Sequence, residues 1–282
     1  MSGWSEVFSS REVRLLDHRS GEFKVWESFA VDDALAESIH QGESGPVLRV
    51  WTHPDSVVLG IADTRVPYLF EAVRWLRDQG YQSIVRNSGG LAVALDEGVL
   101  NLSLLLNDSG SMGIHESYRK MVRFVEALLA DWTDDVEAYE IPESYCPGDY
   151  DLSIDGKKFA GISQRRIRNG IAIQIYLSVT ADHGARARLI REFYQRGIRG
   201  EKTRFDYPAV DPDVMESLET ILGVSITVDE IVKRLEEILL GAGLDVVRDQ
   251  LSPDEKQIFE KRRQLMLERN ERALGELFDG NQ

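Results

Sequence analysis

The sequence YDLSIDGKKFAGISQRRIRNGIAIQIYLSV, residues 150–179, contains three β-type runs separated by two short turns. Asp155-Gly156 separates the first two runs, and Arg168-Asn169-Gly170 separates the second from the third. Asp-Gly and Asn-Gly are strong hairpin signals because these residues accept the positive φ angles of tight turns. The stretch therefore predicts a three-stranded antiparallel meander.

Further strands and helices are predicted on both sides of this meander. Strand-like runs rich in β-branched residues lie at 47–51, 57–61, 83–86, 92–95 and 99–106. Apolar residues at helical spacing predict helices at 31–41, 68–79, 117–132, 185–195, 214–222 and 227–239. This order predicts an α+β fold, in which helices pack on a mixed β-sheet built mostly from hairpins.

The end of the chain predicts one long charged helix at 252–277. Ser252-Pro253-Asp254-Glu255 offers an N-cap, a proline in the first turn and a capping-box glutamate. We expect a catalytic domain over residues 1–245 and a C-terminal helical extension over 246–282.

Composition limits the classes of function. The net charge of −15 argues against a nucleic-acid binder, because phosphate neutralisation needs an excess of basic residues. No apolar run is long enough to span a membrane. The start of the chain lacks a basic region followed by an apolar one, and a single cysteine fits a reducing compartment. We therefore expect a cytoplasmic protein.

Basic residues are concentrated between Arg165 and Arg204. That stretch holds ten lysines and arginines but only three acids: Asp182, Glu192 and Glu201. Such a local excess could steer an acidic partner, and it could equally be a solvated helix face and loop.

Cys146 and Lys158 are the candidate reactive residues. Cys146 lies in the turn-forming sequence Ser144-Tyr145-Cys146-Pro147-Gly148-Asp149, where a side chain can be exposed rather than packed. Lys158 shares a strand face with Ala160 and Ile162, so it is expected to point inward, which requires a polar or negative partner. A nearby ammonium lowers the pKa of a thiol and favours the nucleophilic thiolate. The alternatives are a small packed cysteine and a lysine that snorkels at a strand end.

A second candidate is the loop Arg86-Asn87-Ser88-Gly89-Gly90-Leu91-Ala92-Val93 between two predicted strands. Its glycines allow close approach of a ligand, and its amides could bind a carboxylate or an oxyanion, although such a loop is more often a structural turn. The five histidines are scattered without ligand spacing, so no metal site is predicted. The sequence also lacks the glycine-rich phosphate-binding motifs.

Taken in order, these motifs resemble a known superfamily. The loop at 86–93, followed by Asp96 and 100–103, is similar to the Arg-x-Ser-Gly-Gly-x-Ala-Val signature of the biotin and lipoate protein ligases, and 155–161 is similar to their lysine strand. Residues 144–152 narrow the resemblance to the octanoyl-[glycine cleavage H protein]:protein octanoyltransferases. The resemblance covers roughly residues 25–245. It implies a biotin/lipoate protein ligase-like mixed sheet flanked by helices.

The resemblance also implies an activity that needs no cofactor and no ATP. Cys146 matches the residue that carries the acyl group as a thioester, and Lys158 matches the lysine that lowers its pKa. An octanoyl group would pass from the glycine cleavage H protein to lysines of the lipoyl domains of 2-oxoacid dehydrogenases. The implied substrate-binding residues are Arg86, Ser88, Gly89, Gly90, Ala92, Val93 and Gly161. Leu91 stands where the ligases usually have a third glycine, which argues against nucleotide binding in their manner.

Three alternatives remain open from the sequence. The first is an octanoyltransferase that takes its acyl group from acyl carrier protein. The second is an ATP-dependent lipoate ligase, and the third is a protein that binds lipoyl domains without catalysing a reaction. The donor, the acyl-chain length and the oligomeric state are not fixed by the sequence.

Overall fold

The structure is a computed structural model that describes residues 7–8, 10–108 and 112–280. The expectation about a leader sequence concerns residues 1–6, which lie outside this range. Among the described residues, no helix combines the length and apolar character needed to cross a membrane.

A large mixed sheet forms the centre of the molecule. Its order within the described chain is β11-β1-β2-β6-β10-β9-β8-β7. β1 is parallel to both β11 and β2, and the other neighbouring pairs are antiparallel. The predicted meander is confirmed as β8-β9-β10. The bounds are β1 Glu12–His18, β2 Val47–Trp51, β6 Val99–Asn107, β7 Glu137–Ala138, β8 Leu152–Ile154, β9 Lys157–Ile167, β10 Gly170–Ser178 and β11 Asp245–Arg248.

A smaller sheet, β4-β3-β5, lies beside the large one. β3 (Ser56–Leu59) is parallel to β4 (Gln82–Val85) and antiparallel to β5 (Val93–Leu95). The glycine-rich loop at 86–92 therefore joins the parallel strand of this sheet to the antiparallel one.

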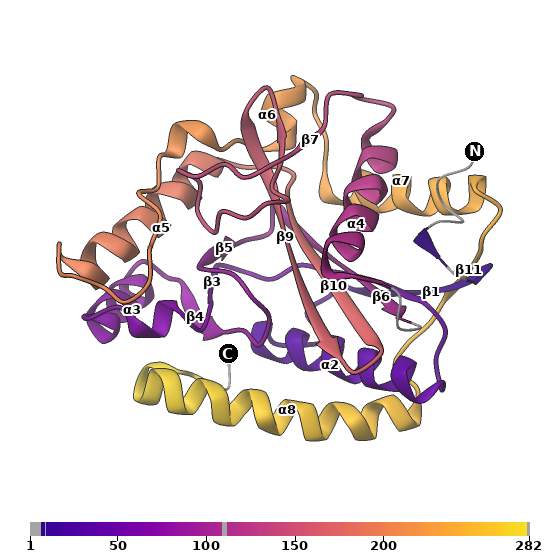
Figure 1. The fold of residues 1–282 in the computed structure, drawn as a ribbon, viewed down its shortest axis with the longest axis horizontal. Coiled ribbons are helices and arrows are strands. Elements are labelled where there is room, and N and C mark those ends of the chain that lie inside the picture. The colour runs from indigo at the N-terminus through magenta and orange to yellow at the C-terminus, as the bar shows by residue number, and fades with distance from the viewer. Residues whose placement is uncertain (1–6, 9, 109–111, 281–282) are drawn as a thin grey trace.

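Helices cover both faces of the large sheet (Figure 1). α2 packs on β6, β9 and β10 from one face, and α4 packs on β9 and β10 from the other, with α7 beside it. α8 runs along the outer side of α2, and α3 and α5 pack together next to the small sheet (Figure 1). The bounds are α2 Val25–Gln41, α3 Leu69–Asp78, α4 Ile114–Leu129, α5 His183–Ile198, α6 Leu218–Leu222, α7 Val228–Gly241 and α8 Pro253–Leu274, with the 3-10 turns η1 Asp63–Arg65, η2 Pro212–Val214 and η3 Gly275–Leu277.

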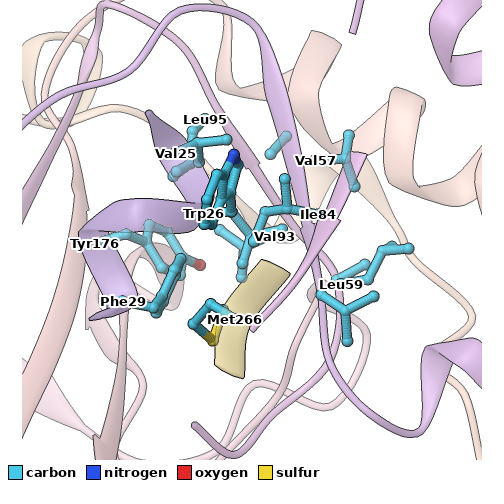
Figure 2. Packing of buried hydrophobic residues seen from close by; sticks show 14 of the residues in the cluster. Val25, Trp26, Phe29, Val57, Leu59, Ile84, Val93, Leu95, Tyr176 and Met266 are labelled. Carbon is cyan, nitrogen blue, oxygen red and sulfur yellow. The ribbon is translucent and has the colours of Figure 1, made fainter. Parts of the chain in front are cut away.

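The core that borders the site lies between α2, the small sheet and α8. Figure 2 shows Trp26 and Phe29 of α2 facing Val93 and Leu95 of β5, with Met266 of α8 closing one side. Burial of such large apolar side chains is worth about 1.5–3 kcal/mol each, so this cluster fixes the small sheet against α2.

Two predictions of local structure were wrong. Residues 214–222 do not form one helix: η2 and α6 are separated by an extended Met215, because Met215 forms a β-bridge with Lys158 of β9. The first long helix begins at Val25 rather than at residue 31. Asp32, near the start of the predicted range, is buried within α2 and pairs with Arg49. The strand β1 and the edge strands β7 and β11 were missed.

The C-terminal helix was predicted correctly. Ser252 caps α8, its side chain accepts from the amide of Glu255, and the glutamate accepts from the Ser252 amide in return. α8 packs along α2, and the division of the chain at residue 245 stays a prediction.

Candidate active site

Cys146 lies in the loop between β7 and β8, in a strained backbone conformation. Its φ is 47°, in the left-handed region that non-glycine residues rarely adopt. The side chain is half-buried and lines a cavity of about 210 Å³. Strain of this kind persists where the surrounding structure over-determines it, and functional sites are a common place for it.

Two donors surround the sulfur of Cys146. The backbone N–H of Leu91 donates to Sγ at 3.1 Å, and Nη2 of Arg86 lies 3.3 Å from the same atom. Arg86 also donates to the carbonyl oxygen of Leu91 at 2.8 Å, so one side chain closes the loop and faces the sulfur. A guanidinium and an amide N–H at these distances stabilise negative charge on sulfur.

Position 90 admits only glycine, because neighbouring atoms fill the space that a side chain would occupy. Its φ is 103°, and a Cβ there would lie 2.3 Å from Nη2 of Arg86 and 2.8 Å from Sγ of Cys146. Gly60 meets the same loop from the other side, since a Cβ on it would lie 1.9 Å from the Gly90 carbonyl oxygen. Both glycines are therefore required for the close approach that brings Arg86 to the thiol.

Lys158 is fully buried and holds the backbone of the Cys146 loop. Its Nζ donates to the carbonyl oxygens of Tyr145 and Cys146 and to Oγ of Ser144, each at 3.0 Å. It also pairs with Asp151 at 2.9 Å. The sequence placed this ammonium beside the thiol, but its described contacts are with the loop's backbone and with Ser144 and Asp151.

Asp151 completes this arrangement. Its carboxylate accepts from Lys158 and, at 3.2 Å each, from the amides of Ile141 and Gly148 on the two sides of Cys146. Burial raises the pKa of Asp151, and Lys158 and the two amides oppose that rise. The loop at 141–151 is thus folded around one buried ion pair.

A second buried acid supports the glycine-rich loop. Asp63 accepts from the Gly60 amide at 2.7 Å and from the Tyr194 hydroxyl at 2.8 Å. The Ala92 amide donates to the same hydroxyl at 3.3 Å. Burial raises the pKa of Asp63 to about 6. Through these contacts Asp63 and Tyr194 hold Gly60 and the glycine-rich loop next to each other.

The cavity at Cys146 continues into the core. A narrower hollow of about 30 Å³ shares five lining residues with it: Arg86, Val93, Gly161, Ser163 and Tyr176. The inner hollow is also lined by Phe29 and Leu95, which lie with Val93 and Tyr176 in the apolar cluster of Figure 2. Together the two hollows form a mainly apolar slot that starts at the thiol.

The structure places the predicted site residues unequally. Arg86, Gly89, Gly90, Val93 and Gly161 line the cavity together with Cys146. Ser88 and Ala92 are buried but do not line the slot. Oγ of Ser88 lies 3.5 Å from Oγ of Ser163, and the amide of Ala92 donates to the Tyr194 hydroxyl. The amide that donates to the sulfur is that of Leu91, and the suggested binding of an oxyanion by the amides near Gly89 and Gly90 stays a prediction.

Several residues of the site gave no sequence signal. Tyr118 and Tyr176 line the cavity from α4 and β10. Asp151 did carry a signal, because an inward lysine on the neighbouring strand β9 requires a negative partner. Within the described ranges, no group of three or more histidine, cysteine or acidic side chains could hold a metal.

The basic stretch between Arg165 and Arg204 does not form one free surface. Five of its nine arginines, on β9 and on α5, form ion pairs with this chain's own acids: Arg165 with Asp33, Arg166 with Asp108, Arg186 with Asp96, Arg188 with Asp182 and Arg196 with Glu192. Its role as a docking surface stays a prediction.

Comparison with known proteins finds similarity over nearly the whole chain. The family model of the lipoyl protein ligase A/B catalytic domain matches residues 24–240. The octanoyl-[GcvH]:protein N-octanoyltransferase of Oceanobacillus iheyensis is 47% identical over 96% of this chain and 99% of its own. The protein of the same name from Geobacillus kaustophilus is 47% identical over 98% and 99%.

Solved structures with the same fold have lower sequence identity. Lipoate-protein ligase A bound with ATP superposes with a TM-score of 0.70 at 20% identity, covering 94% of this chain and 98% of the other. A bi-partite lipoate protein ligase from Thermoplasma acidophilum gives a TM-score of 0.64 at 20% identity, covering 89% and 91%. The predicted mixed sheet flanked by helices is confirmed by this likeness, which concerns the fold alone.

Proposed function

We propose a function for this chain, which belongs to the lipoyl protein ligase A/B catalytic domain family and to the octanoyl-[GcvH]:protein N-octanoyltransferases. It moves an octanoyl group from a lysine of GcvH, the glycine cleavage H protein, to a lysine of a second protein through a thioester on Cys146. The acceptors are the lipoyl domains of 2-oxoacid dehydrogenases. The observation that carries the thioester is the position of the Cys146 sulfur, at the mouth of an apolar slot and between two donors.

In the first step the Cys146 thiolate attacks the amide carbonyl that joins the octanoyl group to the GcvH lysine. A carbon–sulfur bond forms, the carbon–nitrogen bond breaks, and the lysine amine leaves with the proton that the thiol gave up on ionisation. The charge moves from sulfur to the carbonyl oxygen in the tetrahedral intermediate. Arg86 and the Leu91 amide lie beside the sulfur, so they are placed to follow that charge; a donor of this kind is worth about 3 kcal/mol.

In the second step the amine of the acceptor lysine attacks the thioester. The new carbon–nitrogen bond forms, the carbon–sulfur bond breaks, and the thiolate is regenerated as the attacking amine loses a proton. A cysteine intermediate divides the exchange into two easier steps. Because an amide is replaced by an amide, the overall free-energy change is close to zero, and the exchange needs no nucleotide.

The slot supplies recognition of the acyl chain. Each methylene buried away from water contributes about 0.8 kcal/mol, so an eight-carbon chain that fills both hollows gains several kcal/mol over a short one. Val93 and Tyr176 line both hollows and would contact the chain along much of its length.

Lys158 acts in this proposal as a positioning residue. By donating to the carbonyl oxygens of Tyr145 and Cys146, it keeps the loop in the conformation that turns Sγ toward Arg86. A thiol that must stay reduced to react fits the cytoplasm, which is the location we propose.

The test is intact-mass measurement of the enzyme after mixing with octanoylated GcvH. We expect the enzyme to gain the mass of one octanoyl group and to lose it when a lipoyl domain is added. Cys146→Ser should gain nothing while remaining folded by circular dichroism. A full transfer rate in Cys146→Ser would contradict the thioester.

Octanoyl acyl carrier protein is the matched alternative donor in the same measurement. An enzyme that is acylated by the carrier protein and not by octanoylated GcvH would belong to the other kind of octanoyltransferase. An enzyme that binds lipoyl domains but is acylated by neither donor would be a binding protein only.

A further inference from the structure

A pocket of about 290 Å³ lies on the far side of the glycine-rich loop from Cys146. Four arginines line it: Arg165 from β9, and Arg262, Arg269 and Arg272 from α8. Two acids, Asp33 and Glu268, also line it, and Asn87, Leu265 and Met266 complete the wall. The pocket is therefore a concentration of positive charge on a chain whose net charge is −15.

Part of this charge is left without an internal partner. Asp33 pairs with Arg165 at 3.1 Å and with Arg262 at 3.8 Å, and Arg262 also pairs with Glu37. Arg269 and Arg272 have no ion-pair or hydrogen-bond partner among the residues that the structure describes. Burial and the neighbouring guanidiniums of Arg165 and Arg272 lower the pKa of Arg269, although Asp33 partly offsets this. Like charges held together in this way favour binding of an anion.

The pocket is next to the acyl slot along the same face of β9. Gly161 and Ser163 line the Cys146 cavity, and alternation along a strand places Arg165 on their face. At about 3.3 Å per residue, Arg165 is only about 13 Å from Gly161. The loop separates the two hollows: Arg86 and Gly89 face the cavity, Asn87 faces the pocket, and Ser88 meets Ser163 between them.

α8 holds the pocket at a fixed distance from the site. Asn270 of α8 is fully buried, and its side-chain amide pairs with both backbone groups of Val85, accepting from the N–H at 2.6 Å and donating to the carbonyl oxygen at 3.3 Å. Val85 directly precedes Arg86. Asn270 thus connects α8, which carries three of the pocket's arginines, to Val85, and the next residue after Val85 is the Arg86 that faces the thiol.

We propose that this arginine pocket, formed by Arg165, Arg262, Arg269 and Arg272, docks carboxylate side chains of GcvH and so orients its octanoyl-lysine toward Cys146. The inference rests on the proposed function and adds a surface that the catalytic-domain match at 24–240 leaves out, since three of the arginines lie beyond it. A chain with a net charge of −15 repels the carboxylates of a partner over most of its surface, so a local basic pocket selects the orientation in which the two proteins meet. Arginine suits this role because its guanidinium binds a carboxylate through two hydrogen bonds.

The test measures the dissociation constant of octanoylated GcvH for the full chain in the Cys146→Ser background, where no transfer interferes. We expect Arg269→Glu combined with Arg272→Glu to weaken binding about tenfold or more at low salt, and the loss to shrink at high salt. Arg269→Lys with Arg272→Lys should retain most of the affinity. Lys256→Glu combined with Lys261→Glu is the matched control, because it reverses two exposed charges on the same helix outside the pocket.

Equal dissociation constants for the double reversal in the pocket and the Lys256→Glu, Lys261→Glu control would overturn the proposal. So would a loss that salt does not reduce. Because binding is measured without chemistry, this result is separate from the mass measurement on the wild-type enzyme, and failure of the thioester would appear only there.

Discussion

Arg86 places Nη2 at 3.3 Å from the sulfur of Cys146, whereas Lys158 places Nζ at 3.0 Å from the carbonyl oxygen of the same residue. Two cations thus act on one cysteine from different directions. Arg86 faces the atom that reacts, and Lys158 faces the backbone that carries it. The two contacts predict different consequences when each cation is removed.

Removal of Arg86 should reduce the reactivity of the thiol. In Arg86→Gln the guanidinium charge next to Sγ is lost, and we expect alkylation of Cys146 by iodoacetamide at pH 7 to slow by about tenfold, because one charge-assisted contact is worth roughly 1.5 kcal/mol. Arg86→Lys should recover part of the rate. Equal alkylation rates in wild type and Arg86→Gln would show that the guanidinium does not activate the thiol.

Removal of Lys158 should reduce stability. Lys158→Met leaves Asp151 buried without its cation, which costs about 3–5 kcal/mol of unfolding free energy in comparable cases. Urea unfolding measures this loss. Lys158→Met combined with Asp151→Leu should be more stable than Lys158→Met alone, because no charge is left uncompensated. If Lys158 acts on the thiol and has no role in the loop, stability should be unchanged and only alkylation should slow.

Much of the fold could be predicted from residue pattern because its decisive elements are local. Asp155-Gly156 specifies the first hairpin through the positive φ angles of both residues, whereas in the second turn the positive φ falls on Arg168 and Gly170 already pairs with Ile167. The edge strands could not be found in this way. β11 is a short, mostly exposed strand, and its pairing with β1 joins segments more than two hundred residues apart.

The site could be predicted only in part, for a similar reason. Cys146 and Lys158 were recognisable by their places in motifs. The contacts that give them their roles depend on packing between the loop at 86–92 and the loop at 141–151, about sixty residues apart in the chain. Arg86 approaches the sulfur only because Gly60 and Gly90 let two backbones meet, and residue pattern does not show that meeting.

The buried carboxyl of Asp63 should give the protein a specific dependence of stability on pH. Its pKa is raised from 3.8 to about 6, so the native state binds a proton more tightly than the unfolded state does. The contribution of Asp63 to the unfolding free energy is therefore highest below about pH 4, falls as the pH rises toward 6, and is constant above about 7. The total fall is about 3 kcal/mol at 1.36 kcal/mol per unit.

Asp63→Asn removes this titration. Urea unfolding of both proteins between pH 4 and pH 8 should show the stability of wild type falling relative to the variant as the pH rises, with the change centred between pH 4 and pH 6. The altered contacts with Gly60 and Tyr194 change the unfolding free energy by a constant amount, which does not affect its slope against pH. A difference that does not vary with pH would mean that the carboxyl titrates alike in both states.

The inner hollow should set the preferred length of the acyl chain. Val58 of β3 is buried and lines the inner hollow but not the cavity at Cys146, so Val58→Phe shortens the slot from its far end and leaves the thiol in place. An octanoyl chain has four more methylenes than a butanoyl chain, worth about 3 kcal/mol of burial or about two orders of magnitude in rate. We expect Val58→Phe to lose most of that preference when kcat/KM for acylation of Cys146 is compared between p-nitrophenyl octanoate and p-nitrophenyl butanoate. The ratio is measured within one variant, so a smaller folded fraction affects both esters equally.

Val57→Phe is the matched control, because Val57 adjoins Val58 on the strand and lines neither hollow. It should keep the wild-type ratio. An unchanged ratio in Val58→Phe would place the end of the acyl chain elsewhere.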